Sequence, residues 1–397
     1  MQYRELIKGE EKLSVLGYGC MRFPQTNGKI NEEETEKQIL YAIKEGINYF
    51  DTAYPYHGGK SEVVLGNILE KHNMREDVYI ADKMPSYLVR TDKDIEKFFN
   101  TQLERLKTNY IDYYLMHTLD SLAAWERLKK FGMIEYIEKW KKEGKIKHIG
   151  FSFHGRIEEF KKIVDDYDWE FCQIQYNYLD ENYQAGTEGL EYAYAKGLGV
   201  IIMEPLRGGS LSSNVPDKVK KRFENYSKDR SPAEWALKWL WNQEEVSVIL
   251  SGMNVLDHVK ENMRVASETH PNSLKEEEIE VIDDVKEIYK ELMKVPCTGC
   301  NYCMPCPFGV DIPGAFSAYN DKYFFDDKMA GFKYVGFSSG ITGGKESGAN
   351  LCKACGKCEK VCPQHIKIIE ELKNVDKELD SKLMRFGIKV FKKIKRI

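Results

Sequence analysis

Of the ten cysteines in the 397-residue sequence, all except Cys20 and Cys172 lie in two short stretches. The first stretch has the spacing C-x2-C-x2-C-x2-C-P, and the second has C-x2-C-x2-C-x3-C-P. The candidate ligands are Cys297, Cys300, Cys303 and Cys306 in the first stretch and Cys352, Cys355, Cys358 and Cys362 in the second. The second spacing is typical of chains that hold iron–sulfur clusters. The two stretches therefore predict two [4Fe–4S] clusters.

The spacing also predicts how the thiolates are shared. In two-cluster proteins of the bacterial ferredoxin type, the fourth cysteine of such a run ligates the other cluster. One cluster is then held by Cys297, Cys300, Cys303 and Cys362, and the other by Cys352, Cys355, Cys358 and Cys306. Zinc is the alternative, because it also takes four thiolates, but commonly as two C-x2-C pairs separated by a longer spacer. Cys20 and Cys172 lie in apolar runs and are expected to be inert buried residues.

Composition and charge exclude several classes of protein. The formal net charge of −4 provides no general basic field, so we expect no nucleic-acid partner. The charged start of the chain lacks the apolar run of a signal peptide, and no stretch approaches the length of a membrane span. We therefore expect a cytoplasmic protein, in which crowded cysteines bind metal rather than form disulfides. Oxygen-sensitive clusters further suggest an anaerobic or low-oxygen cytoplasm.

The first 270 residues alternate short apolar runs with amphipathic segments. The apolar runs cover residues 15–21, 48–53, 78–84, 111–117, 147–153, 171–177, 199–205 and 246–252. Each run has the length and composition of a strand that is buried on both faces. Helical patterns cover 33–45, 92–107, 123–143 and 231–242, and Asn31 and Thr91 have the sequence context of helix N-caps. Eight such strand–helix units favour a (β/α)8 TIM barrel, with an open doubly wound sheet as the alternative.

The remaining sequence divides into a connecting helix and a second domain. The predicted domains are the barrel at 1–272, an amphipathic helix at 273–295, and a small, mainly α-helical ferredoxin-like domain at 296–397. The last segment, 381–397, is basic and amphipathic. It is expected either to pack on the cluster domain or to dock on an acidic partner or membrane surface.

Four polar residues follow successive predicted strands. The second strand ends near Asp51 and Tyr56, the third near Lys83, and the fourth near His117. In a TIM barrel the C-terminal ends of the strands surround the active site, so these four side chains are expected to converge on one pocket. Each of them also has a structural interpretation, such as a helix cap, a surface tyrosine or a core histidine.

Several segments, in this order, resemble the aldo-keto reductase family: "FDTAYPYHGGKSEVVLG", "ADK", "IDYYLMH", "GFS", "QIQYN", "EPLRGG" and "VILSGMNVLDHVKEN". The resemblance covers residues 1–270, and the whole chain resembles the subgroup with a C-terminal ferredoxin-like domain. It implies that Tyr56 is the general acid and that the Lys83 ammonium pulls the pKa of this phenol down. It also implies that Asp51 holds Lys83 and that His117 orients the carbonyl of the substrate.

The resemblance further implies an NADP or NAD cofactor across the top of the barrel. The implied binding residues are Ser152 and Gln175 for the carboxamide, Leu206 and Arg207 for the pyrophosphate, Ser251, Gly252 and Met253 for the ribose, and Glu261 and Asn262 for the adenine. The sequence departs from the commonest family pattern at Phe153, Met203, Gly252 and His258. Because a neutral histidine is a poor phosphate clamp, the choice between NADP and NAD stays open.

Two functional hypotheses follow. In the first, the chain is an NAD(P)-dependent oxidoreductase that transfers a hydride between NAD(P)H and a small carbonyl or alcohol substrate, and the clusters serve electron transfer or structure. In the second, it is an electron-transfer or redox-sensing iron–sulfur protein whose barrel is a docking scaffold for a flavoprotein or other redox partner. A hydride carries two electrons and each cluster accepts one, so direct exchange requires a mediator such as a flavin or a redox-active substrate.

Overall fold

The computed structural model describes residues 1–213, 215–297, 299, 302–325, 327–341, 345–362, 364–380, 385–388 and 390. The chain divides into two compact units. The first unit comprises Met1–Gly208 and Ala233–Lys275, and the second comprises Gly209–Pro232 and Glu276–Ile397. The second unit includes the segment 209–232, which the sequence pattern does not separate from the barrel.

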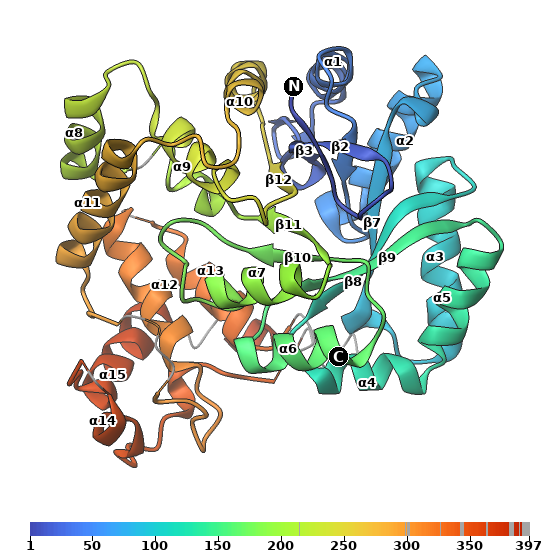
Figure 1. Cartoon of the computed structure of the whole chain (residues 1–397). Helices are drawn as coiled ribbons and strands as arrows, with labels where there is room; N and C mark the ends of the chain where they lie inside the picture. Colours follow the sequence, from blue (N-terminus) through green and yellow to red (C-terminus); the bar gives the residue numbers. More distant parts are fainter. Residues whose placement is uncertain are drawn as a thin grey trace. The chain divides into compact units, whose positions relative to one another are not determined.

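The first unit contains the predicted closed barrel of parallel strands (Figure 1). The strands are β3 (Leu16–Gly19), β6 (Tyr49–Asp51), β7 (Tyr79–Met84), β8 (Ile111–Leu119), β9 (Ile146–Phe153), β10 (Phe171–Gln175), β11 (Gly199–Met203) and β12 (Val248–Ser251). Their order around the barrel is β10-β11-β12-β3-β6-β7-β8-β9. Closure between β9 and β10 excludes the open doubly wound sheet.

The strands form because their apolar residues are covered on both faces. Inside the barrel lie side chains such as Tyr49, Tyr113 and Phe171, and a larger apolar layer separates the strands from the helices. Two short antiparallel hairpins accompany the barrel: β1 (Tyr3–Glu5) with β2 (Lys12–Ser14), and β4 (Gln25–Thr26) with β5 (Lys29–Ile30). Near-continuous apolar runs are typical of parallel strands that are buried in this way.

Helices surround the strands of the first unit (Figure 1). They are α1 (Glu32–Lys44), α2 (Ser61–His72), α3 (Asp92–Leu106), α4 (Leu122–Lys130), α5 (Met133–Lys142), α6 (Ile157–Asp166), α7 (Gly186–Ala195), α9 (Pro232–Trp241) and α10 (Leu256–Glu268). Both predicted N-caps are confirmed: the Asn31 side chain accepts a hydrogen bond from the Glu34 N–H, and Thr91 forms a capping box with Asp94. The single helix predicted over 123–143 is wrong, because Gly132 takes a left-handed φ of 82° and separates α4 from α5.

The second unit is helical in its described part. Its helices are α8 (Asp217–Tyr226), α11 (Glu276–Leu292), α12 (Ile312–Phe324), α13 (Ala330–Ser338), α14 (Lys357–Val361) and α15 (Ile368–Leu379). The helix α11 lies within the segment 273–295, which the sequence pattern predicts to be helical, and it packs on α8, where Arg222 Nε lies 2.8 Å from Asp284 Oδ2. Within the described residues, no helix has the length and apolar character needed to cross a membrane. Most of the basic segment 381–397 lies outside the described residues.

Candidate active site

A lysine and an aspartate form a buried ion pair at the ends of two neighbouring strands. Asp51 is the last residue of β6, and Lys83 lies in β7; their exposed fractions are 3% and 0%. Lys83 Nζ donates hydrogen bonds to Asp51 Oδ1 at 2.6 Å and to the Thr52 carbonyl at 2.8 Å. Burial lowers the pKa of Lys83, but the charges of Asp51 and Tyr56 outweigh it and raise this pKa overall. The ammonium group is therefore charged and held in one place.

Tyr56 lies next to Lys83 of this pair. It begins the short helix η2 (Tyr56–Gly59), and Lys83 Nζ is 5.2 Å from the centre of its ring. The residue as a whole is partly exposed, but the surroundings of its hydroxyl group are buried. Burial raises the pKa of Tyr56 to about 12, while Lys83 acts in the opposite direction. The expectation that Lys83 pulls this pKa down is right for the direction of the lysine contribution and wrong for the net shift, because burial is the larger effect.

His117 is a further neighbour of Tyr56. Its ring centre is 6.0 Å from that of Tyr56 in an edge-to-face arrangement and 6.2 Å from that of Tyr87. Burial, followed by the charges of Lys83 and His154, lowers the pKa of His117 well below its ordinary value, so the imidazole is neutral at pH 7. Its Nδ1 atom is buried and has no hydrogen-bond partner among the described residues. A neutral imidazole with a free nitrogen is available to hydrogen-bond a substrate.

The segment that carries Tyr56 has an unusual backbone. His57, Gly58 and Gly59 have φ values of 51°, 64° and 87°, all in the left-handed region. His57 stacks on Phe23 with ring centres 5.6 Å apart, and its Nε2 accepts a hydrogen bond from the Phe23 N–H. Since a non-glycine residue rarely takes such a φ without outside support, this segment depends on its contacts with neighbouring elements.

Ser152 lies near the end of β9, and two glutamines, Gln173 and Gln175, lie in β10. Ser152 is buried, and its Oγ accepts a hydrogen bond from the Thr118 N–H at 2.8 Å. Gln175 Nε2 donates to Asp180, and its Oε1 accepts from Gln184, so both ends of this amide have protein partners. The register instead pairs Ser152 with Gln173, which is 2% exposed and has a buried Oε1 without a partner among the described residues. Sequence reasoning missed Gln173, because only the register between β9 and β10 shows which glutamine neighbours the serine.

The other residues assigned to the cofactor lie in different environments. Ser251 Oγ accepts a hydrogen bond from Asn262 Nδ2 at 3.0 Å, and Arg207 lies 3.4 Å from the buried carboxylate of Asp180. Leu206 packs at the edge of the core, and the side chain of Met253 lies within it. Glu261 is partly exposed on α10, and a Cβ atom added to Gly252 would lie 2.9–3.1 Å from the side chain of Arg22. The structure therefore brings Ser251 and Asn262 together and leaves the Met253 side chain in the core.

Seven cysteines of the second unit lie among the described residues. They are Cys297, Cys303, Cys306, Cys352, Cys355, Cys358 and Cys362, and all except Cys355 pack against one apolar core. The Ala354 N–H points at Cys352 Sγ, 3.4 Å away. Cys300 lies outside the described residues. Thiols gathered on one core, with a backbone N–H donor aimed at a sulfur, fit iron–sulfur ligation. That the last cysteine of each stretch ligates the other cluster stays a prediction.

Comparisons with protein families match both parts of the chain. The model of the aldo/keto reductase family matches residues 15–287, and that of the 4Fe-4S dicluster domain matches residues 296–367. The first match includes the residues around Tyr56, and the second includes both cysteine stretches.

Individual relatives agree with these families. L-galactose dehydrogenase of Arabidopsis thaliana is 26% identical over 300 residues, which cover 71% of this chain and 93% of the relative. Protein tas of Escherichia coli (strain K12) is 25% identical over 352 residues, with coverages of 73% and 99%. The holo structure of aldo-keto reductase AKR11C1 from Bacillus halodurans, 26% identical, has a TM-score of 0.59 and covers 72% of this chain and 96% of its own. This chain therefore belongs to the aldo/keto reductase family and is an oxidoreductase with a C-terminal 4Fe-4S dicluster domain.

Proposed function

We propose that the barrel transfers a hydride between NAD(P)H and a small carbonyl or alcohol substrate. The observation that carries the proposal is the buried Lys83–Asp51 pair below Tyr56, with neutral His117 facing the same phenol. A buried ion pair costs desolvation energy and is weak evidence for stability by itself. In a barrel that served only as a docking scaffold, this pair would have no role, so the arrangement favours the enzyme.

Tyr56 acts as the general acid in the direction of reduction. With its pKa raised to about 12, the phenol is protonated at pH 7 and can donate its proton to the carbonyl oxygen. As the proton leaves, the Lys83 ammonium stabilises the phenolate that forms, and Asp51 keeps the ammonium in place. His117 donates a second hydrogen bond to the same oxygen and orients the carbonyl. A general acid of this kind contributes roughly 10²–10⁴ to the rate.

The cofactor site of the proposal lies at the ends of β9 to β12. NAD(P)H supplies the hydride when it is bound. The carboxamide would be held by Ser152 with Gln173 or Gln175, and the unpartnered Oε1 of Gln173 supports Gln173. Arg207, Ser251 and Asn262 would hold the rest of the dinucleotide.

The second unit would hold two [4Fe–4S] clusters that serve electron transfer or structure. Exchange with the barrel would pass through a flavin or a redox-active substrate, because each cluster accepts a single electron. Anaerobic addition of NADH or NADPH alone, followed by visible spectroscopy, tests this point. Bleaching of the clusters without any mediator would contradict it.

The test of the catalytic assignment compares Tyr56→Phe with wild type in anaerobically purified full-length protein. NADPH and NADH oxidation is measured with 4-nitrobenzaldehyde as the probe carbonyl. We expect Tyr56→Phe to lose at least ~10²-fold in kcat with unchanged cluster absorbance. The matched control is Tyr136→Phe on α5, which removes a phenol outside the site and should leave turnover unchanged. Equal turnover by Tyr56→Phe and wild type would refute the assigned acid.

A further inference from the structure

An arginine of α3 contacts the segment that carries Tyr56. Arg105 Nη1 donates a hydrogen bond to the Tyr54 carbonyl at 3.3 Å, and its Cζ lies 4.3 Å from the centre of the Tyr54 ring. The guanidinium group of Arg105 also packs beside Gly59. A Cβ atom added to Gly59 would lie 3.1–3.2 Å from three guanidinium atoms. The guanidinium group therefore hydrogen-bonds the chain two residues before Tyr56 and occupies the space beside Gly59, three residues after it.

Arg105 is itself held by a buried carboxylate. Its Nη1 lies 2.7 Å from Glu62 Oε2, and the Glu62 side chain is fully buried in the first turn of α2. Since α2 begins two residues after Gly59, Glu62 and Arg105 join α3 to the start of the next helix. The planar guanidinium fork suits this combination of carboxylate, backbone carbonyl and aromatic ring, whereas a lysine ammonium can reproduce only the charge.

The same helix face also supports Lys83. Gln102, one turn before Arg105 on α3, donates a hydrogen bond from Nε2 to the Lys83 carbonyl at 2.9 Å, and its Oε1 accepts one from the Tyr114 hydroxyl at 2.7 Å. One helix thus contacts the backbone beside both the phenol and the amine of the site.

We propose that Arg105 is a positioning residue for catalysis: through Glu62, the Tyr54 carbonyl and the Tyr54 ring, it holds the left-handed segment 57–59 so that Tyr56 stays above Lys83. This inference rests on the proposed function for its effect on turnover, but the holding itself is a structural property. A loss of the arginine fork should let Tyr56 move, and a displacement of about 1 Å can cost ~10²-fold in rate.

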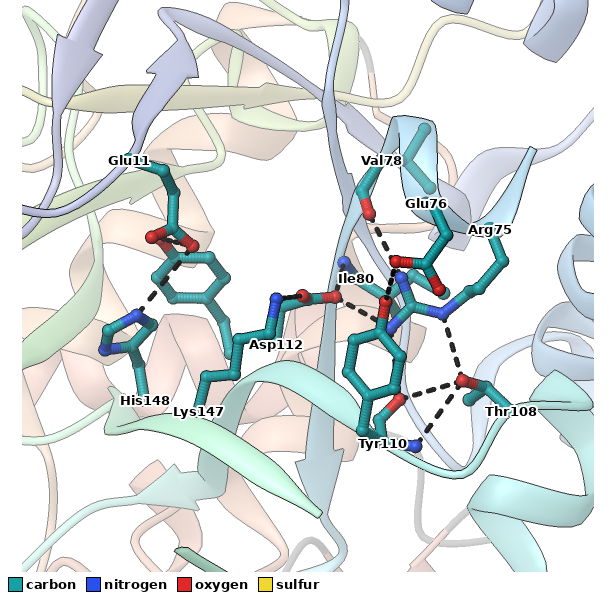
Figure 2. Close-up of polar contacts among 11 residues, drawn as sticks. Glu11, Arg75, Glu76, Val78, Ile80, Thr108, Tyr110, Asp112, Lys147 and His148 are labelled. Atoms are coloured by element: carbon teal, nitrogen blue, oxygen red, sulfur yellow. Dashed lines mark hydrogen bonds and ion pairs between the residues drawn. The ribbon is translucent and has the colours of Figure 1, made fainter. Parts of the chain in front are cut away.

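A second arginine with the same chemistry provides a matched control (Figure 2). Arg75, in η3 (Arg75–Asp77), places Nη2 2.8 Å from the buried carboxylate of Asp112 and donates to the Tyr110 carbonyl at 3.1 Å. Its Cζ lies 4.0 Å from the centre of the Tyr110 ring. Both Arg75 and Tyr110 precede the strands β7 and β8, so this group lies at the N-terminal ends of the strands, opposite to Tyr56.

The experiment compares Arg105→Lys and Arg75→Lys in the anaerobic full-length protein. Lysine keeps each buried carboxylate paired with a positive charge, so both variants are expected to fold. Steady-state kinetics use 4-nitrobenzaldehyde with NADPH or NADH, and hydrogen-exchange mass spectrometry follows peptides that cover residues 53–60 and 108–113. For Arg105→Lys we expect kcat to fall ~10–100-fold, with the KM for the aldehyde within about twofold of wild type. Exchange in 53–60 should be about tenfold faster.

The control should behave in the opposite way. Arg75→Lys should accelerate exchange in 108–113, leave 53–60 unchanged and keep kcat at the wild-type value. Equal losses of kcat in the two variants would indicate a general loss of stability and overturn the proposal. If the wild-type protein does not reduce the aldehyde, the proposed function fails. The hydrogen-exchange data alone then decide whether Arg105 holds the segment around Tyr56. Unchanged exchange in 53–60 of Arg105→Lys would then overturn the inference.

Discussion

The replacement Lys83→Met tests whether the buried ion pair is coupled as the structure indicates. Methionine has a similar length but removes the ammonium that lies 2.6 Å from Asp51 and 2.8 Å from the Thr52 carbonyl. Asp51, only 3% exposed, would then be a buried carboxylate without an ionic partner. We expect the free energy of unfolding of the first unit to fall by about 3–5 kcal/mol, the usual cost of removing one partner of a buried pair.

The loss should depend on pH in a defined direction. Burial already raises the pKa of Asp51, and removal of the lysine charge removes an opposing effect, so the folded variant binds a proton more tightly than the unfolded chain. The penalty is therefore absent below the unfolded pKa of about 3.9 and grows as the pH rises toward the folded pKa. Relative to wild type, Lys83→Met should be less destabilised at about pH 5 than at about pH 8.

Tryptophan fluorescence during urea unfolding is a suitable assay. The six tryptophans of the chain all lie in the first unit, so the signal reports the barrel and not the cluster domain. The double variant Lys83→Met with Asp51→Asn is the matched control, because it removes the carboxylate that was left unpaired. It should recover a large part of the lost stability and abolish the pH dependence, while remaining inactive.

Two results would refute this reasoning. One is a Lys83→Met protein as stable as wild type at about pH 8, which would mean that Asp51 is not desolvated in the folded state. The other is a destabilisation that Asp51→Asn does not relieve at all, which would place the cost in packing rather than in charge.

Three further predictions concern the phenol, the clusters and one glycine. Because the pKa of Tyr56 is raised to about 12, kcat for carbonyl reduction should not fall between about pH 6 and about pH 9, and a pH–rate profile with a midpoint near pH 8 would contradict this. Anaerobic protein should contain iron and sulfide for two [4Fe–4S] clusters; Cys355→Ser should lower both and Cys172→Ala neither, whereas colourless zinc-loaded protein would exclude clusters. Gly132→Ala should lower the free energy of unfolding by about 1–2 kcal/mol, measured by tryptophan fluorescence, because the glycine has a φ of 82°.

Local patterns in the sequence determined much of this protein. The apolar runs predicted the eight strands, because strands that are buried on both faces need continuous apolar residues. Asn31 and Thr91 marked helix starts, since capping depends on residues three or four positions apart. The cysteine spacings pointed to iron–sulfur ligation in the same way, because the ligands of such a cluster lie mostly within one short loop.

Only the tertiary structure decided the features that depend on neighbours distant in the sequence. Gln173, rather than Gln175, lies beside Ser152 because of the register between β9 and β10. The net pKa of Tyr56 depends on its burial in the folded chain, which outweighs the opposing effect of the Lys83 charge. Arg105 gains its contacts from two other elements, and nothing in its own segment marks it, because a helical arginine is more often a solvated surface residue.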